Sequence, residues 1–295
     1  MSFQVTENMV QQYANNFRML YQQKVSRLRP WCQIESGIVG TSKSVERMGK
    51  SEAYDITSRH ADTKFVETPH SRRWLDLSDK GWADLIDKLD KLRLLADPTN
   101  GYAMMANAAL NRAMDDVIIS AARGNARSNA GLVALPSTQK VAVTASSLTL
   151  AKLLATKEIL DSNEVDDDAS MQADGQGGTP SRVIVVNSKM LTNLYGTTEI
   201  KSVDYNSVKA LAQGTIDTFL GFKFVRTERL PKDGTATTGY ALAWSRSCVA
   251  LGIGQEINTS VDKRPDKNNA YQVFADMSIG ATRVEDEGVV EIACA

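Results

Sequence analysis

A long, capped helical pattern between Asp97 and Gly124 constrains the fold of this chain more than any other feature. Asp97 can accept a hydrogen bond from a free amide at the start of a helix, and Pro98 suits the first helical position because no amide is lost there. Gly124 can end the helix in a left-handed conformation. Between these ends, small and apolar residues recur at steps of three and four: Tyr102, Ala106, Leu110, Ala113, Val117 and Ala121, with Met114 and Ile118 beside them. The pattern predicts one helix of about 25 residues, roughly 40 Å long.

Charged residues support this helix. Arg123 places a positive charge at the negative end of the helix dipole. Arg112 and Asp116 lie four residues apart, a spacing at which opposite charges can pair. A buried helix of an enzyme would give the same pattern, so the helix alone does not define the class of protein.

The composition restricts the class further. A chain of 295 residues forms one large domain or two smaller ones, and its net charge of −1 provides no overall attraction to nucleic acid or to a membrane surface. No apolar run approaches the ~20 residues of a membrane span, and the first ten residues lack the apolar core of a signal peptide. Three widely spaced cysteines indicate reduced thiols in a cytoplasm-like compartment and no metal site: Cys32, Cys248 and Cys294.

Residues 1–40 are predicted to form an N-terminal arm. Apolar residues recur at helical spacing and stop at Pro30: Met9, Tyr13, Phe17, Leu20 or Tyr21, Val25 and Leu28. Such a helix could dock on another molecule or pack on the core of its own domain, and the stripe alone leaves both open.

Residues 41–80 are predicted to form an extended loop, a long β-hairpin. Residues 45–56 run out, residues 57–63 form the tip, and residues 65–75 run back, with Pro69 arguing against a central strand. An isolated hairpin is marginally stable in water, and this one is polar, so we expect it to rest on another chain. A disordered loop is the alternative, although loops of this length are uncommon and usually functional.

Four residues near the base of this hairpin are candidate intersubunit contacts: Glu67, Arg72, Arg73 and Trp74. An arginine can bind a carboxylate of a neighbour through two hydrogen bonds, which a lysine cannot reproduce. Trp74 can anchor the base by burial. The alternative is that both arginines are simply solvated.

The rest of the chain mixes helices and strands. Residues 78–96 are predicted to be a helical link, with Trp82, Leu85, Ile86, Leu89, Leu92 and Leu95 on its apolar side. Further predicted elements are a turn at 125–131, helices at 148–160, 188–195 and 245–251, and strands at 182–187, 222–226 and 240–244. Residues 271–282 alternate as a long half-buried strand, with Thr282 on the polar side, and residues 286–288 are predicted to turn it into 289–293 as a hairpin.

An acidic stretch interrupts this second half. Residues 158–181 hold seven acidic side chains and no basic one, which predicts a solvated surface loop. A calcium site at Asp166, Asp168 and Asp174 is a sharper alternative. The pattern departs from a calcium-binding EF-hand because Met171 stands where glycine is required.

No catalytic constellation is evident, so we expect no enzyme, cofactor or metal. His60 and His70 both lie in the extended loop, a poor place to hold a general base. The chain lacks the sequence motifs of serine hydrolases, phosphate-binding loops and dinucleotide-binding folds. Cys248 is expected to be a buried small apolar residue.

The order of these elements resembles the major capsid protein of tailed phages with the Hong Kong 97 fold, in its podovirus-like branch. An arm, an extended loop and the helix from Asp97 to Gly124 carry the resemblance at the front of the chain. The later segments that carry it are Val185–Lys189 with Leu191–Leu194, Gly214–Val225, Leu230–Pro231 and Arg283–Val290.

The resemblance implies an α+β fold with four parts. These are an N-terminal arm (1–40), an extended loop (41–80), a peripheral domain (81–144 and 259–295) that contains a long spine helix (98–123), and an axial domain (145–258). No long helical segment precedes the arm, which implies a separate scaffolding protein.

It also implies self-assembly into pentamers and hexamers of an icosahedral head enclosing double-stranded DNA, in a virion assembled in the host cytoplasm. The implied partners are other copies of the chain, a scaffolding protein, a portal and a decoration protein, and no membrane. Residues 1–75 carry 11 basic and 7 acidic side chains, which permits weak, non-specific contact with DNA. No acidic–lysine–asparagine set can be assigned to the family's crosslink, and none is predicted. An encapsulin-like nanocompartment shell and a soluble enzyme are the alternatives.

Overall fold

The computed structural model describes residues 20–60, 62–87, 99–143, 147–165, 181–196, 218–232 and 239–295. Several predictions lie outside these residues: the arm stripe up to residue 19, the helix start at Asp97 and Pro98, residues 88–96, the three calcium candidates, and residues 214–217. The described part of the arm, 20–28, holds no helix, so the predicted helical stripe does not extend to Leu28. Leu28 is nonetheless fully buried, and Pro30 lies in a short 3-10 helix, η2 (Arg29–Trp31).

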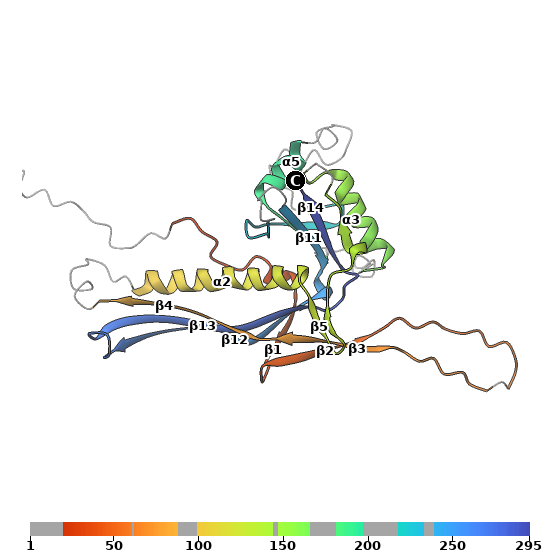
Figure 1. Ribbon diagram of the computed structural model, residues 1–295, viewed down its shortest axis with the longest axis horizontal. Coiled ribbons are helices and arrows are strands. Elements are labelled where there is room, and N and C mark those ends of the chain that lie inside the picture. Colours follow the sequence, from red (N-terminus) through yellow and green to blue (C-terminus); the bar gives the residue numbers. More distant parts are fainter. Residues whose placement is uncertain are drawn as a thin grey trace, which may run out of the picture. The chain divides into compact units, whose positions relative to one another are not determined.

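The described strands form three sheets (Figure 1). The first has the order β1 (Gln33–Ser36), β12 (Val249–Arg264), β13 (Ala270–Arg283) and β4 (Ser78–Ile86). The second has the order β7 (Lys140–Val141), β14 (Val289–Cys294), β11 (Gly239–Ser245), β8 (Arg182–Val186), β10 (Phe222–Arg226) and β9 (Thr218–Phe219). The third has the order β2 (Ser42–Met48), β3 (His70–Asp76), β5 (Ala126–Ser128) and β6 (Gly131–Val133).

Three α-helices and two further 3-10 helices complete the described elements: α2 (Thr99–Arg123), α3 (Leu150–Ser162), α5 (Ser188–Gly196), η3 (Ser137–Gln139) and η4 (Arg246–Cys248). The chain divides into two compact units, one of residues 1–26, 79–113 and 255–278, and one of residues 27–78, 114–254 and 279–295. Helix α2 and strands β4, β12 and β13 continue from one unit into the other.

The long helix is confirmed, with a shifted buried face. The fully buried stripe runs at steps of four, through Ala106, Leu110, Met114, Ile118 and Ala122. Ala113, Val117 and Ala121, which were predicted at the centre of that face, are only partly buried. The predicted face was centred on Ala113 and Val117, whereas the buried face is centred one residue later, on the larger side chains of Met114 and Ile118.

Three details of this helix differ from prediction. Gly124 ends the helix without a positive φ. Its amide donates to the carbonyl oxygen of Ser120 at 2.8 Å. A Cβ at position 124 would lie 2.6 Å from that same oxygen. Arg112 donates to Gln22 Oε1 at 2.7 Å instead of pairing with Asp116. Asp116 instead forms an ion pair with Arg229.

The predicted helical link at 78–96 is wrong over its described part. Residues 78–86 form strand β4, at the edge of the first sheet, and bury Ile86. Trp82 and Ile86 are four residues apart, a spacing that fits one face of a strand as well as one face of a helix. Gly81 lowers helix propensity at the centre of the segment, and pairing in the sheet decides the outcome.

The long C-terminal strand is confirmed as β13, and its buried residues alternate through Val273, Ala275, Met277 and Ile279. The alternation then breaks, because Thr282 is buried, opposite to prediction.

The predicted closing hairpin is wrong. Strand β14 pairs antiparallel with β11 and parallel with β7 in the six-stranded sheet. Non-local pairing sets this partner, so the local turn signal was misleading.

The six-stranded sheet carries the main core of its unit. Every residue of β14 is buried, as are four of the five residues of β8, and Trp244 in β11 donates from its indole nitrogen to the carbonyl of Trp31 at 2.9 Å. The predicted helix at 188–195 is confirmed as α5, and Asn187 caps it, since its Oδ1 accepts from Met190 N at 2.7 Å. The predicted helix at 245–251 shortens to η4, and strand β12 begins at Val249.

Candidate assembly site at the base of the extended loop

The extended loop is an antiparallel hairpin at its base only. Strands β2 and β3 pair from Ser42 opposite Asp76 to Met48 opposite His70. Residues 49–60 and 62–69 form no strand, and the orange trace in Figure 1 carries them far beyond the ends of β2 and β3. Large apolar side chains in this segment face solvent: Ile56 is 84% exposed and Phe65 is 91% exposed.

The base of the loop has a core within its own chain. Residues 125–131, predicted as a turn, instead contribute to the β5–β6 hairpin, which extends the sheet beside β3. Leu75 of β3 is fully buried in a cluster with Ile38, Ala250 and Val284. The base of the hairpin is therefore held by its own chain, whereas the contact of the loop with another chain stays a prediction.

One face of this base presents a row of alternating charges around Trp74, which we call the outer row: Glu46, Arg72, Trp74, Arg127 and Asp76. Alternate residues of a strand share one face, and directly paired residues of neighbouring strands lie side by side, so the strand register places these five together. Arg72 Nε donates to Glu46 Oε1 at 2.6 Å, and Arg127 Nη1 donates to Asp76 Oδ1 at 2.8 Å.

The indole of Trp74 lies between the two arginines of the outer row. The guanidinium carbons of Arg72 and Arg127 each lie 5.7 Å from the ring centre, within cation–π range. The indole nitrogen donates to Asn129 Oδ1 at 2.8 Å. Arg72 and Glu46 keep 41% and 61% of their side-chain surface exposed, so the row remains open to a partner.

Arg73 points to the opposite face of β3. Its side chain is 5% exposed, and Nη2 donates to Asp286 Oδ2 of the same chain at 2.5 Å. Burial lowers the pKa of Arg73, against the opposing effect of the Asp286 carboxylate. Arg73 is therefore an intramolecular residue in this structure and does not offer the surface that the sequence prediction assigned to it.

Sequence reasoning missed the residue that completes this inner site, Arg283. Its side chain is fully buried, and Nε donates to Asp286 Oδ1 at 2.6 Å. Its two Nη atoms bind three backbone carbonyls: those of Ala122 at 3.2 Å and Gly124 at 2.6 Å through Nη1, and that of Val133 at 3.0 Å through Nη2. The available signal was the alternation itself, which places Arg283 on the same face as the apolar residues Ile279 and Ala281.

The fourth predicted contact, Glu67, lies in the exposed segment just before β3. The structure does not bring it into the outer row. Of the predicted residues, Arg72 and Trp74 meet in the outer row, Arg73 lies on the inner side, and Glu67 stands apart.

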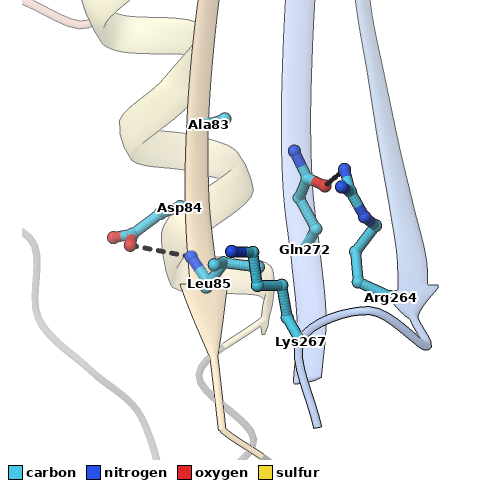
Figure 2. A pocket seen from close by; sticks show the side chains of 6 residues that line it. All are labelled: Ala83, Asp84, Leu85, Arg264, Lys267 and Gln272. Carbon is cyan, nitrogen blue, oxygen red and sulfur yellow. Dashed lines mark hydrogen bonds between the residues drawn. The ribbon is translucent and has the colours of Figure 1, made fainter. Parts of the chain in front are cut away.

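Two hollows lie elsewhere in the described residues. One, of about 290 Å³, is lined by Ala83, Asp84, Leu85, Arg264, Lys267 and Gln272 (Figure 2). There Arg264 donates to Gln272 at 2.7 Å and binds Asp266 twice at 2.8 Å, which holds the pKa of Asp266 at about 2. The other, of about 570 Å³, contains the Arg123–Glu291 ion pair (2.6 Å) and the ion pair of Asp116 and Arg229. Both hollows are lined by charged side chains that form ion pairs.

The cysteines are confirmed as buried free thiols. Burial raises the pKa of Cys32 to about 12 and, to a lesser degree, raises that of Cys294. Cys248 is fully buried, as predicted for a small apolar residue. In the part of the chain that the structure describes, no three metal-ligating side chains come together, and no helix is long and apolar enough to cross a membrane.

Comparisons with known proteins bear on this architecture. In solved structures, the chain is similar to the capsid of Ralstonia phage GP4, with a TM-score of 0.74, 10% identity, and coverage of 97% of this chain and 95% of that chain. It is similar to the Cyanophage Pam1 capsid asymmetric unit, with a TM-score of 0.70, 16% identity, and coverage of 98% and 97%. For a chain of Mycobacterium phage Che8 the TM-score is 0.69, with 16% identity and 97% coverage of both chains. These similarities confirm the predicted Hong Kong 97 fold class.

A comparison with curated proteins found no match. The family model described as phage capsid protein matches residues 5–295. The chain therefore belongs to the phage capsid protein family, and it is a major capsid protein, a virion component that assembles with copies of itself into the shell of a phage head.

Proposed function

We propose that this chain forms the pentamers and hexamers of an icosahedral head around double-stranded DNA, that it is assembled in the host cytoplasm, and that its role is structural and not catalytic. The observation that carries the proposal is the extended loop, whose exposed apolar segment projects from a base held by its own buried core. Exposed apolar surface of this kind marks interaction sites. A closed shell built from one chain needs the same surface to meet several slightly different neighbours, and a long projecting segment suits that requirement.

Within this proposal, the outer row and Glu67 form the polar part of the contact with a neighbouring subunit. Arg72 and Arg127 each donate one hydrogen bond to a carboxylate of their own chain, and each guanidinium carries five N–H donors. The remaining donors of an exposed guanidinium can bind a carboxylate of the neighbour. Trp74 fixes the position of both arginines and adds an apolar surface between them.

The same proposal keeps the division into arm (1–40), extended loop (41–80), peripheral domain (81–144 and 259–295) and axial domain (145–258). It includes a separate scaffolding protein, a portal and a decoration protein as partners. Contact with the packaged DNA is weak and non-specific, in keeping with the mild excess of basic residues in 1–75.

We predict that Arg72→Ala leaves the free subunit folded but lowers the stability of assembled shells. An exposed ion pair contributes ~0–1 kcal/mol to one subunit, and the shell repeats the contact at every copy. Circular dichroism should show an unchanged melting temperature for the free subunit, while shells should release DNA at a lower temperature than wild type.

Lys157→Ala is the matched control, because it removes an exposed ion pair to Asp161 on helix α3, away from the outer row. Shells of Arg72→Ala that match wild-type and Lys157→Ala shells in sedimentation and in thermal release of DNA would overturn the assignment of the outer row to the interface.

A further inference from the structure

We propose that Arg73, Asp286 and Arg283 form a conformational latch that couples the base of the extended loop to the C-terminal end of helix α2. The significance of the latch for shell geometry rests on the proposed function, because the loop that it holds is the proposed intersubunit contact. Its existence can be tested on the free subunit.

Asp286 stands between two buried arginines. One carboxylate oxygen accepts from Arg283 at 2.6 Å and the other accepts from Arg73 at 2.5 Å. The cluster therefore holds two positive charges against one negative charge, and Arg47 of β2 adds a further positive influence on Arg73. Within the described residues, the Asp286 carboxylate links Arg73 of strand β3 to Arg283 of strand β13.

The Arg283 side of the cluster is firmly held. The last carbonyls of a helix lack intrahelical partners, and a cation placed there satisfies them and offsets the helix dipole. Arg283 does this for Ala122 and also binds the carbonyl of Gly124, just past the helix end. Each of its three guanidinium nitrogens has a hydrogen bond within the described residues.

The Arg73 side is loosely held. Its Nε and Nη1 atoms are buried and have no hydrogen-bond partner among the described residues, so its bond to Asp286 is its single polar anchor there. Buried donors without partners are rare in native structures because their loss of water is not compensated. The two arginines thus differ in a definite way: Arg283 stays with the helix, and Arg73 is the member that can leave.

This asymmetry defines what the latch does. When the link between Arg73 and Asp286 opens, strand β3 can shift with the loop attached to it, while Arg283 continues to cap helix α2. The loop then changes its angle without unravelling the helix. A subunit that meets non-equivalent neighbours in a closed shell needs this kind of freedom.

Hydrogen exchange of the full-length chain before assembly tests the latch. Asp286→Asn removes the charge that holds the two arginines together, and Arg283 retains its three carbonyl bonds. Amides of residues 42–48 and 70–76 should exchange at least about tenfold faster than in wild type, whereas amides of 114–123 should change by less than about threefold. Equal acceleration in both regions would show general destabilisation and overturn the latch.

A second substitution distinguishes charge coupling from a merely structural role. In the Asp286→Asn background, Arg73→Met removes the repelled cation and should return exchange in 70–76 to within about threefold of wild type. Arg72→Met in the same background is the control, because that arginine lies on the outer face, and it should give no recovery. A double variant that exchanges faster than Asp286→Asn alone would contradict the proposal.

If Asp286→Asn yields no soluble protein, recovery of soluble folded protein by Arg73→Met, and not by Arg72→Met, supports the latch, and failure of both overturns it.

The outcomes separate the latch from the proposed function. Normal shells from wild type with unchanged exchange in Asp286→Asn would reject the latch alone. The predicted exchange pattern in a chain that never forms shells would reject the proposed function alone.

Discussion

Replacement of Arg283 by methionine is expected to destabilise the folded chain by about 3–5 kcal/mol, the usual cost of removing one partner from a buried ionic cluster. Methionine retains much of the apolar stem, so the loss comes from the guanidinium. Without it, the carbonyls of Ala122, Gly124 and Val133 each lose one hydrogen bond, and Asp286 loses one of its two arginine partners among the described residues. Chemical denaturation of the free subunit, read as a shift in midpoint at constant slope, measures this change.

Arg264→Met serves as the matched control. Arg264 also binds an aspartate that is close in sequence, Asp266, but this arginine is exposed to solvent. The denaturation midpoint of Arg264→Met should stay close to that of wild type, as for most surface substitutions. Arg283→Lys keeps the charge but loses the planar fork, so it should recover only part of the stability. Equal midpoints for Arg283→Met and Arg264→Met would show that the buried cluster does not stabilise the helix end.

The second large effect is expected for Gly280→Ala in strand β13. A Cβ at this position would lie 2.1 Å from the carbonyl oxygen of Asp76 and 3.1 Å from the Leu75 side chain. Because the closest atom belongs to the backbone at the end of β3, a side-chain rotation cannot relieve the clash. The expected cost is about 1–3 kcal/mol or more, as for overpacked cores, and a lowered melting temperature of the free subunit would report it.

Gly81→Ala is the control for this substitution. Gly81 lies in β4, within the same sheet, and the nearest atom to its added Cβ is at 3.8 Å, an ordinary contact distance. It should leave the melting temperature nearly unchanged or raise it slightly, because alanine reduces the freedom of the unfolded chain. Equal melting temperatures for the Gly280→Ala and Gly81→Ala proteins would mean that β3 and β13 do not approach each other this closely.

Local patterns were sufficient for some elements of this fold. The long helix follows from the four-residue spacing of Ala106, Leu110 and Met114, which its own sequence contains. The hairpin of β2 and β3 follows from extended, polar runs on either side of residues 57–63. The burial of Cys248 follows from its apolar neighbours. In each case the information lies within a short stretch of chain.

Pairing between distant segments explains the misses. Strand β4 shares the four-residue spacing of a helix, and only its place at the edge of a sheet shows that it is a strand. Strand β14 follows a turn signal yet joins β11, about 45 residues earlier in the chain, because sheet registry is decided by packing over the whole fold. Neither partner can be read from the residues of the strand itself.

The candidate site was predictable in part. Arg72 and Arg73 are adjacent, and successive side chains of a strand point to opposite faces, so the two could not share one intersubunit surface. The sequence therefore already indicated that the side chains of Arg72 and Arg73 lie on opposite faces. It did not indicate which arginine turns inward, because that depends on Asp286 and Arg283, more than 200 residues away in the chain.

We propose that this chain builds the shell of a phage head through contacts of its extended loop. The most direct test is cryo-electron microscopy of particles produced when the full-length chain is expressed together with the genes that flank its own. We expect closed shells of pentamers and hexamers that protect DNA from nuclease, with residues 49–69 of each copy lying on an adjacent copy. Particles whose shell consists of another chain, or shells in which residues 49–69 contact only their own subunit, would contradict it.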